Sequence, residues 1–170
     1  MVQAANAQAV RPAITGELFR LTQNTTGVTA NTDATCENYA IRYSFAPIWY
    51  YQVQTFEELV ITPEHRVSIY IQDDESSSAE WGDTQHVRVV VWDATMRRMQ
   101  IVYQGRYMQA KEEQDLEKMA HLQMNEPVRL KAGDWIYIEG YCPNTIYTID
   151  VSDSRFSLEM LRVRPTMFQG

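Results

Sequence analysis

The chain has 170 residues, of which 45% are hydrophobic and 22% are charged. These proportions are close to the globular average, so they argue against wholesale disorder and against a collagen-like fibre. The length fits one domain with a sizeable core. The formal net charge of −7 argues against direct nucleic-acid binding, because neutralising phosphates needs a basic surface. The apolar runs are much shorter than a membrane span, so we expect no membrane insertion.

The first 15 residues, MVQAANAQAVRPAIT, are small, polar and nearly uncharged. They lack the basic and apolar regions of a secretory signal. We interpret residues 1–15 as a loosely held arm, which is either a frayed end or a partner-binding segment. Residues 16–170 are then expected to form a single domain.

Alternation of apolar and polar residues is the dominant pattern, and it predicts half-buried β-strands. It is clearest at 39–45, 67–71, 87–91 and 136–138. Further strand candidates, rich in β-branched and aromatic residues, are 16–21, 49–53, 56–61, 99–103, 128–130, 146–151 and 156–163. The polar segments 23–38 and 73–83 are predicted to be long loops.

The last of these strands changes phase. Phe156, Leu158 and Met160 share one face, whereas Leu161 and Val163 take the other. The change predicts either a β-bulge or a strand that passes from one packing environment to another.

Segment 109–123 breaks the alternation. It contains no Gly, Pro or β-branched residue and is rich in helix formers. Its Leu116, Met119, Ala120 and Gln123 are spaced as one helical face, so we expect one helix there. Eleven short strands and one helix in a single domain predict an all-β antiparallel sandwich or barrel.

The two cysteines, Cys36 and Cys142, both lie among turn-forming residues. Their thiols allow one bridge within the chain, bridges between chains, or none. A separation of 106 residues, with no paired His/Cys cluster, argues against zinc.

Residues that carry chemistry show none of the familiar spacings. His65, His86 and His121 lack the patterns of a cupin-type or metalloprotease metal site, and no Gly-x-Ser-x-Gly element occurs. The acidic segment 73–83 offers carboxylates for calcium, but it lacks the ligand spacing of an EF-hand, so we interpret it as a solvated loop. We therefore expect no catalytic residue, no metal site and no cofactor, and hence not an enzyme.

The aromatic residues, 10 Tyr, 5 Phe and 4 Trp, are more informative. Several bulky rings fall on strand faces that are not the most probable core faces. Such rings bind sugars or form protein interfaces, and they also cover the faces of a two-layer sandwich. The candidate interface residues are Trp49, Tyr50, Tyr51, Leu116, Met119, Trp135 and Tyr137.

The segment 128–140, VRLKAGDWIYIEG, resembles a recurring jelly-roll element, a short strand, a Gly-Asp turn and an alternating strand. This element occurs in cupins, tumour-necrosis-factor-like domains and viral capsid proteins. Gly133 allows the tight turn, Asp134 bonds its own backbone, and Ile136 and Ile138 point to the core. The resemblance implies a jelly-roll barrel.

The polar arm with its RPAITG sequence at 11–16, the many strands, the single helix and the acidity extend the resemblance. Together they resemble the single jelly-roll major capsid proteins of tailless icosahedral phages with an internal membrane that infect thermophilic bacteria. The chain is similar to the smaller of the two major capsid proteins of such phages.

This resemblance implies a structural protein that is made in the host cytoplasm and located in the virion capsid. It implies homodimeric building blocks and a second, larger major capsid protein as partner. The net charge adds a basic, membrane-associated virion protein as a candidate partner. The alternative is a lectin-like sandwich that binds carbohydrate through Trp49, Tyr50, Tyr51 or Trp135, and a weaker alternative is a metal-free cupin-like enzyme.

Overall fold

The computed structural model describes residues 16–31, 44–73, 84–108, 119–141 and 149–163. Within these residues the fold is all-β. The strands are β1 (Glu17–Thr22), β2 (Thr29–Ala30), β3 (Ala46–Gln52), β4 (Glu58–Ile61), β5 (Arg66–Asp73), β6 (Thr84–Asp93), β7 (Arg98–Met108), β8 (Ala120–His121), β9 (Val128–Lys131), β10 (Trp135–Tyr141) and β11 (Ile149–Val163). The described part of the chain contains no helix, and so none that is long and apolar enough to cross a membrane.

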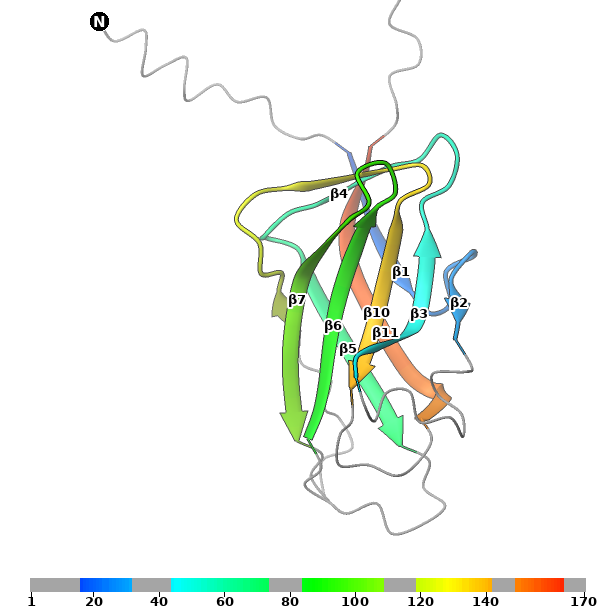
Figure 1. Ribbon diagram of the computed structural model, residues 1–170, viewed down its shortest axis with the longest axis vertical. Helices are drawn as coiled ribbons and strands as arrows, with labels where there is room; N and C mark the ends of the chain where they lie inside the picture. The colour runs from blue at the N-terminus through cyan, green and yellow to red at the C-terminus, as the bar shows by residue number, and fades with distance from the viewer. Residues whose placement is uncertain (1–15, 32–43, 74–83, 109–118, 142–148, 164–170) are drawn as a thin grey trace, which may run out of the picture.

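The strands form two antiparallel sheets that run along the long axis of the molecule (Figure 1). Sheet B has the order β2-β3-β10-β6-β7, and consecutive β6 and β7 form a hairpin within it. Sheet A is built around β11. One edge of β11 pairs with β1, and the other pairs first with β5 and then with β4. Two outer strands complete sheet A, β8 beside β5 and β9 beside β4.

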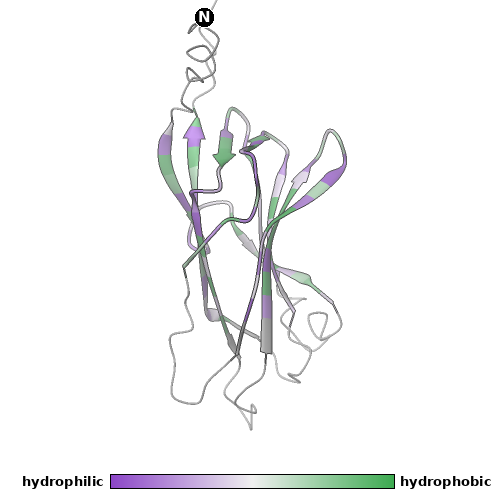
Figure 2. Ribbon diagram, turned by 90° about the vertical axis from the view of Figure 1, so that its left-hand side faces the viewer, coloured by the Kyte–Doolittle hydropathy of each residue, from purple (hydrophilic) through white to green (hydrophobic). Residues whose placement is uncertain are grey.

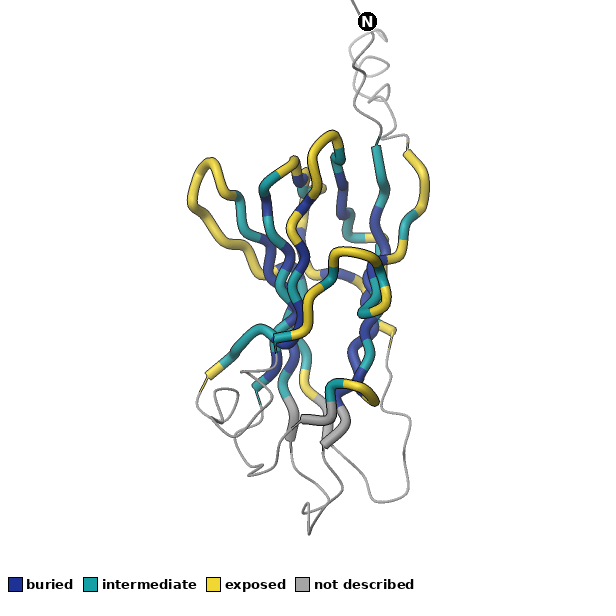
Figure 3. Tube along the Cα trace, turned by 90° about the vertical axis from the view of Figure 1, so that its right-hand side faces the viewer, coloured by how far each residue is buried: buried dark blue, intermediate teal, exposed yellow. Residues whose placement is uncertain are grey.

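The two sheets share one hydrophobic core. Apolar and polar residues alternate along the strands of both sheets (Figure 2), and the buried positions gather midway along the strands (Figure 3). In β10, for example, Ile136 and Ile138 are buried while their neighbours are half-buried. Trp49 of sheet B and Phe156 of sheet A meet across the core, with ring centroids 5.0 Å apart.

Most of the predicted strands are confirmed. The expected strands at 67–71, 87–91 and 136–138 lie in β5, β6 and β10, and the remaining candidates that fall in the described ranges correspond to β1, β3, β4, β7, β9 and β11. Of the strand predicted at 39–45, residues 39–43 lie outside the described residues and 44–45 precede β3. The short strand β2 lies in a segment expected to be a loop.

The helix predicted at 109–123 is wrong for residues 119–123, which the structure describes. Residues 109–118 lie outside the described residues. Ala120 and His121 form β8, which pairs with Val67 and Arg66 of β5. Pairing with an exposed sheet edge has overridden the helix propensity of these residues.

The phase change in β11 has the second of its two predicted causes. Pairing with β1 runs without interruption from Ser157 to Arg162, so no bulge occurs there. On its other edge β11 leaves β5 after Leu158 and pairs with β4 from Leu161. The strand therefore passes from one neighbour to another at the point where the alternation reverses.

Gln123 covers part of the open edge of sheet B. Its backbone N–H donates to the Val102 carbonyl (2.6 Å). Its side-chain amide accepts from the Gln104 N–H (3.0 Å) and donates to the Gln104 carbonyl (3.1 Å). An open strand edge promotes pairing with other chains, so these contacts protect β7 in the way that a neighbouring strand would.

Gly140 of β10 faces the core at a position with no room for a side chain. A Cβ there would lie 2.7 Å from Ile48 Cδ1 and 3.0 Å from Ile71 Cδ1. We predict that Gly140→Val lowers the free energy of unfolding by about 2 kcal/mol, because overpacking forces neighbours out of their rotamers. Urea denaturation followed by tryptophan fluorescence measures the change.

The control is Ala30→Val, which also creates a valine, but at an exposed strand position. It is expected to leave the unfolding midpoint almost unchanged. An equal loss in both variants would show that the cost is not specific to the core.

Candidate functional site

The outer face of sheet B carries an apolar surface formed by opposed residues of four strands. Tyr137 of β10 lies opposite Tyr50 of β3 on one side and Val90 of β6 on the other. Ile101 of β7 lies opposite Val90. Directly opposed residues in an antiparallel sheet project from the same face and are in contact. This row therefore crosses the sheet from β3 to β7.

A second row lies beside the first. Trp135 of β10 lies opposite Trp92 of β6, and Trp92 lies opposite Met99 of β7. We call the two rows together the aromatic face. Its members are Tyr50, Val90, Trp92, Met99, Ile101, Trp135 and Tyr137.

The rings of the aromatic face pack against one another. Tyr50 and Trp135 have centroids 5.9 Å apart, and Trp135 stacks on Tyr137 at 6.0 Å with planes inclined by 17°. Burial, and then the charges of Glu139 and Tyr50, raises the pKa of Tyr137 above its usual value. The rings of Tyr50, Trp135 and Tyr137 therefore hold one another in place, and the surroundings of the Tyr137 hydroxyl are partly apolar.

Val90 lies among these rings on the outer side of the sheet. It alternates with the core residues Val89 and Val91, so its side chain points away from the core. Nevertheless it is only 3% exposed. By contrast Met99 and Ile101, further out on β7, are 52% and 37% exposed. The aromatic face thus combines a buried centre with an exposed apolar margin.

Two predicted interface residues, Trp49 and Tyr51, lie elsewhere. Both are buried in the core, with exposed fractions of 1% and 3%. The register of β3 shifts at Ile48, so that Trp49 lies opposite Ile138 while Pro47 lies opposite Glu139. A bulge of this kind adds one residue and resets the alternation. The expectation that these two rings are exposed is therefore wrong.

Tyr51 has a polar partner in the core. Its hydroxyl donates to Glu57 Oε2 at 2.6 Å, and Glu57 Oε1 lies 3.3 Å from Arg162 Nη2. Burial, and then the contact with Glu57, raises the pKa of Tyr51 far above its usual range. This network links β3 to β11 and fixes the phenol inside the core.

The other predicted site residues are distributed as follows. Met119 is 50% exposed and lies next to β8 in sheet A, away from the aromatic face. Leu116, Cys36, Cys142 and the acidic segment 74–83 lie outside the described residues. Trp135, Tyr137 and Tyr50 are brought together, whereas Val90, Trp92, Met99 and Ile101 were missed. The signal for Val90 and Trp92 was present, because both fill the supposedly polar positions of an alternating strand.

An ion pair borders the aromatic face. Arg88 Nε donates to Glu139 Oε1 across β6 and β10, and both side chains are largely buried, with 19% and 12% exposed. The guanidinium of Arg88 also lies 4.2 Å from the ring centroid of Phe45. The pair compensates its own charges, so the border is polar but carries no net charge.

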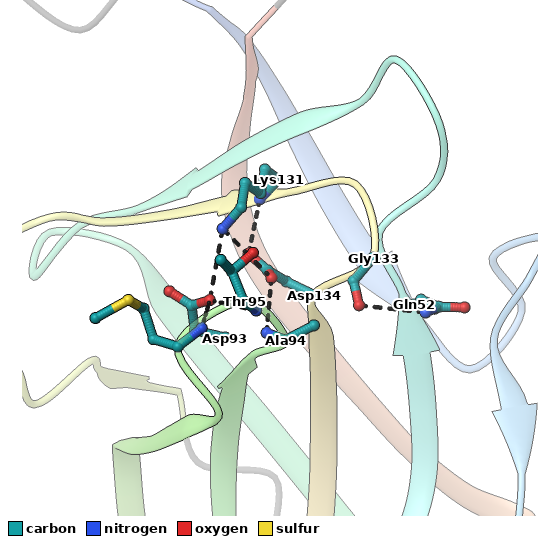
Figure 4. Close-up of polar contacts among 8 residues, drawn as sticks. Gln52, Asp93, Ala94, Thr95, Lys131, Gly133 and Asp134 are labelled. Carbon is teal, nitrogen blue, oxygen red and sulfur yellow. Dashed lines mark hydrogen bonds and ion pairs between the residues drawn. The ribbon is translucent and has the colours of Figure 1, made fainter.

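Asp134 positions the strands on which the aromatic face depends (Figure 4). Its Oδ1 accepts from the Ala94 N–H (3.0 Å) and its Oδ2 from the Lys131 N–H (2.9 Å). The side chain is only 1% exposed. It therefore ties the β6–β7 hairpin to the β9–β10 turn, immediately before Trp135. The predicted turn role of Asp134 is confirmed, and the contact with Ala94 extends it.

Asp93 and Lys131 surround this contact. Asp93 Oδ1 accepts from the Thr95 and Met96 N–H groups, and Lys131 Nζ lies 3.5 Å from the same oxygen. The hydrogen bond from Met96, together with those from Thr95 and Lys131, lowers the pKa of Asp93. These contacts keep the hairpin in one conformation.

The outer face of sheet A differs from the aromatic face because it carries two ion pairs, which lie beside an apolar row formed by Leu18, Leu161 and Val60. Arg66 Nε lies 2.8 Å from Glu159 Oε1, and Arg129 Nη1 lies 3.0 Å from Glu58 Oε1. Burial alone would raise the pKa of Glu159, but Arg66, together with Arg20, outweighs burial and holds the pKa below its usual value.

Groups that bind metals or react are scattered over the described residues. No set of three His, Cys, Asp or Glu side chains converges there. His65 Nδ1 instead accepts from the Thr62 N–H (3.0 Å), and burial lowers the pKa of this histidine. A surface hollow of about 440 Å³ beside β7 is lined by Gln100 and by residues 123–128, and its lining is mainly polar.

Comparison with known proteins adds no assignment. No protein-family model matches the chain, and no curated protein matches it.

Asp134→Ala is predicted to lower the free energy of unfolding by about 3 kcal/mol, because two backbone N–H groups lose a charged acceptor. Asp134→Asn keeps one acceptor oxygen and should lose about half as much. Thermal and urea unfolding measure both changes. The control is Asp93→Asn at the half-buried neighbouring carboxylate, which should change stability less. An Asp134→Ala protein as stable as the parent would contradict this role.

Glu159 is predicted to make the fold acid-sensitive. Its pKa is depressed in the folded state, so its stabilising effect is complete above about pH 5 and is lost as the pH falls below the unfolded value of about 4.3. Glu159→Gln should therefore flatten the fall in unfolding free energy between about pH 5 and pH 3. Urea titrations at several pH values measure this slope. Glu58→Gln, in the more exposed pair, is the control and should retain the parent slope.

Proposed function

We propose that this chain is a jelly-roll capsid subunit, a structural virion protein that associates with copies of itself and with a second, larger capsid protein. The observation that supports the jelly roll is the order of strand pairing. One sheet contains β1-β11-β5-β8 and the other β3-β10-β6-β7. In chain order these eight strands alternate between the sheets except at the β6–β7 hairpin. That pattern is what two nested Greek keys produce.

A fold alone does not determine function, so the capsid role rests on the surfaces. The aromatic face presents Met99 and Ile101 to solvent beside packed rings. Contiguous apolar surface of this kind marks sites of protein association. The resemblance of the sequence to single jelly-roll capsid proteins supports the same function. The proposed location is therefore the virion shell, with a basic membrane-associated protein as a further partner of this acidic chain.

A second candidate is carbohydrate binding, and the aromatic rings favour it. Trp49 and Tyr51 are excluded from such a site by their burial, which leaves Tyr50 and Trp135 of the residues first considered. Their rings already stack against each other and against Tyr137, so less ring surface is free for a sugar. We therefore rank this candidate second.

The proposed function predicts concentration-dependent self-association of the full chain. Size-exclusion chromatography with light scattering, from about 1 µM to 1 mM, should show dimers or larger species, with and without reductant. Electron microscopy at the highest concentration tests for ordered assemblies. A monomer under every condition, with binding on a glycan array, would favour the carbohydrate-binding candidate instead.

A further inference from the structure

The aromatic face has a buried apolar centre and an exposed apolar margin, as one side of a protein–protein interface does. Val90 is 97% buried on the solvent side of sheet B, because opposed neighbours Tyr137 and Ile101 surround it. Beyond this centre, Met99 and Ile101 expose apolar surface that nothing in the described residues covers. Burial of these side chains would gain about 25 cal/mol per Å², which offsets the rotamer freedom that Met99 and Ile101 lose in a contact.

The electrostatics of the two outer faces select sheet B for contact. Covering the outer face of sheet A would desolvate the pairs Arg66–Glu159 and Arg129–Glu58, whose cations are 45% and 58% exposed. Removing such charges from water costs more than their attraction returns. On sheet B the pair Arg88–Glu139 is already largely buried, so a partner that covers the two rows of the aromatic face would desolvate little additional charge.

Charge also indicates which partner fits. The chain carries −7 overall, so two copies repel each other at most surfaces. The two rows of the aromatic face contain no charged side chain, and their bordering ion pair is neutral. Two copies can therefore approach on this face without opposing like charges.

The dimensions fit a modest contact of this kind. Four strands spaced about 4.8 Å apart give a width of roughly 20 Å, and the two rows lie two residues apart on each strand, about 7 Å between their backbones. The two rows alone therefore cover less than the ~800 Å² per partner of a standard interface, as is typical of weak, reversible association. A sheet of this size packs on another sheet about 10 Å away, as sheets do inside a sandwich.

We infer that the aromatic face is a twofold interface on which the same face of a second copy packs, with Tyr137 and Val90 near the axis. A twofold contact brings the same residues of both copies together, so apolar rows meet apolar rows and Arg88–Glu139 lies at the rim. This inference rests on the proposed function, because it presumes self-association. It adds the surface and the symmetry of the contact.

The first test is site-directed cross-linking of the full chain with Cys36→Ser and Cys142→Ser. In that background Tyr137→Cys should give a covalent dimer with a short bismaleimide, because the two copies of residue 137 face each other across the axis. Leu18→Cys, on the outer face of sheet A and 58% exposed, is the control and should give none. Cross-linking at Leu18→Cys but not at Tyr137→Cys would overturn the inference.

The second test measures association. Met99→Glu combined with Ile101→Glu should weaken dimerisation by about 100-fold, because four like charges would be buried in the contact. Both positions are exposed, so the monomer should keep its far-ultraviolet circular dichroism and melting temperature. Met96→Glu, at a 63% exposed methionine in the same hairpin but outside the two rows, is the matched control.

The outcomes separate the two proposals. If the parent associates and only the double variant dissociates, the aromatic face is the interface. If the double variant associates as strongly as the parent, the inference is wrong while the proposed function stands. If the parent is monomeric at every concentration, the proposed function fails, and the twofold contact fails with it.

Discussion

The alternation of side chains along β10 determines both faces of sheet B. Successive side chains of a strand point to opposite faces, so Ile136 and Ile138 enter the core only if Trp135 and Tyr137 point outward. The sequence places large apolar groups on both sides. Sheet B therefore has one apolar face that the core of the molecule covers and a second one that it does not. The outer face is as much a product of the strand geometry as the core is.

This constraint makes the ends of β10 important. Asp134 accepts hydrogen bonds from two turns directly before Trp135, and Gln52 donates to the Gly133 carbonyl at 3.2 Å in the same region. Together these contacts set the relative positions of β3, β10 and the β6–β7 hairpin. The outer rings stack on one another in that arrangement. A buried polar cluster at one end of the sheet thus organises an apolar surface along its length.

Sequence periodicity predicted the strands well because the alternation of buried and exposed positions is visible within each strand's own sequence. It failed where a single residue or a distant neighbour decided the outcome. Trp49 is buried because Ile48 is an extra residue in β3, and no alternation pattern contains that bulge. Ala120 and His121 form a strand because β5 offers an edge, which is a contact between residues more than 50 positions apart.

The candidate site was predicted in part for the same reasons. Tyr50, Trp135 and Tyr137 were recognised as outward rings from their own strands. Met99 and Ile101 join them only through the register of β6 and β7, which determines the residues that lie opposite each other. Register is a property of paired strands, so a single strand pattern does not contain it.

The exchange of neighbours along β11 has a mechanical consequence. From Ser157 onward strands flank β11 on both edges, β1 on one side and β5 and then β4 on the other, so this part of the strand cannot be peeled away one bond at a time. A pull along β11 must shear several rows of bonds together and loads three other strands at once. The C-terminal half of β11 therefore transmits a load to β1, β4 and β5 together.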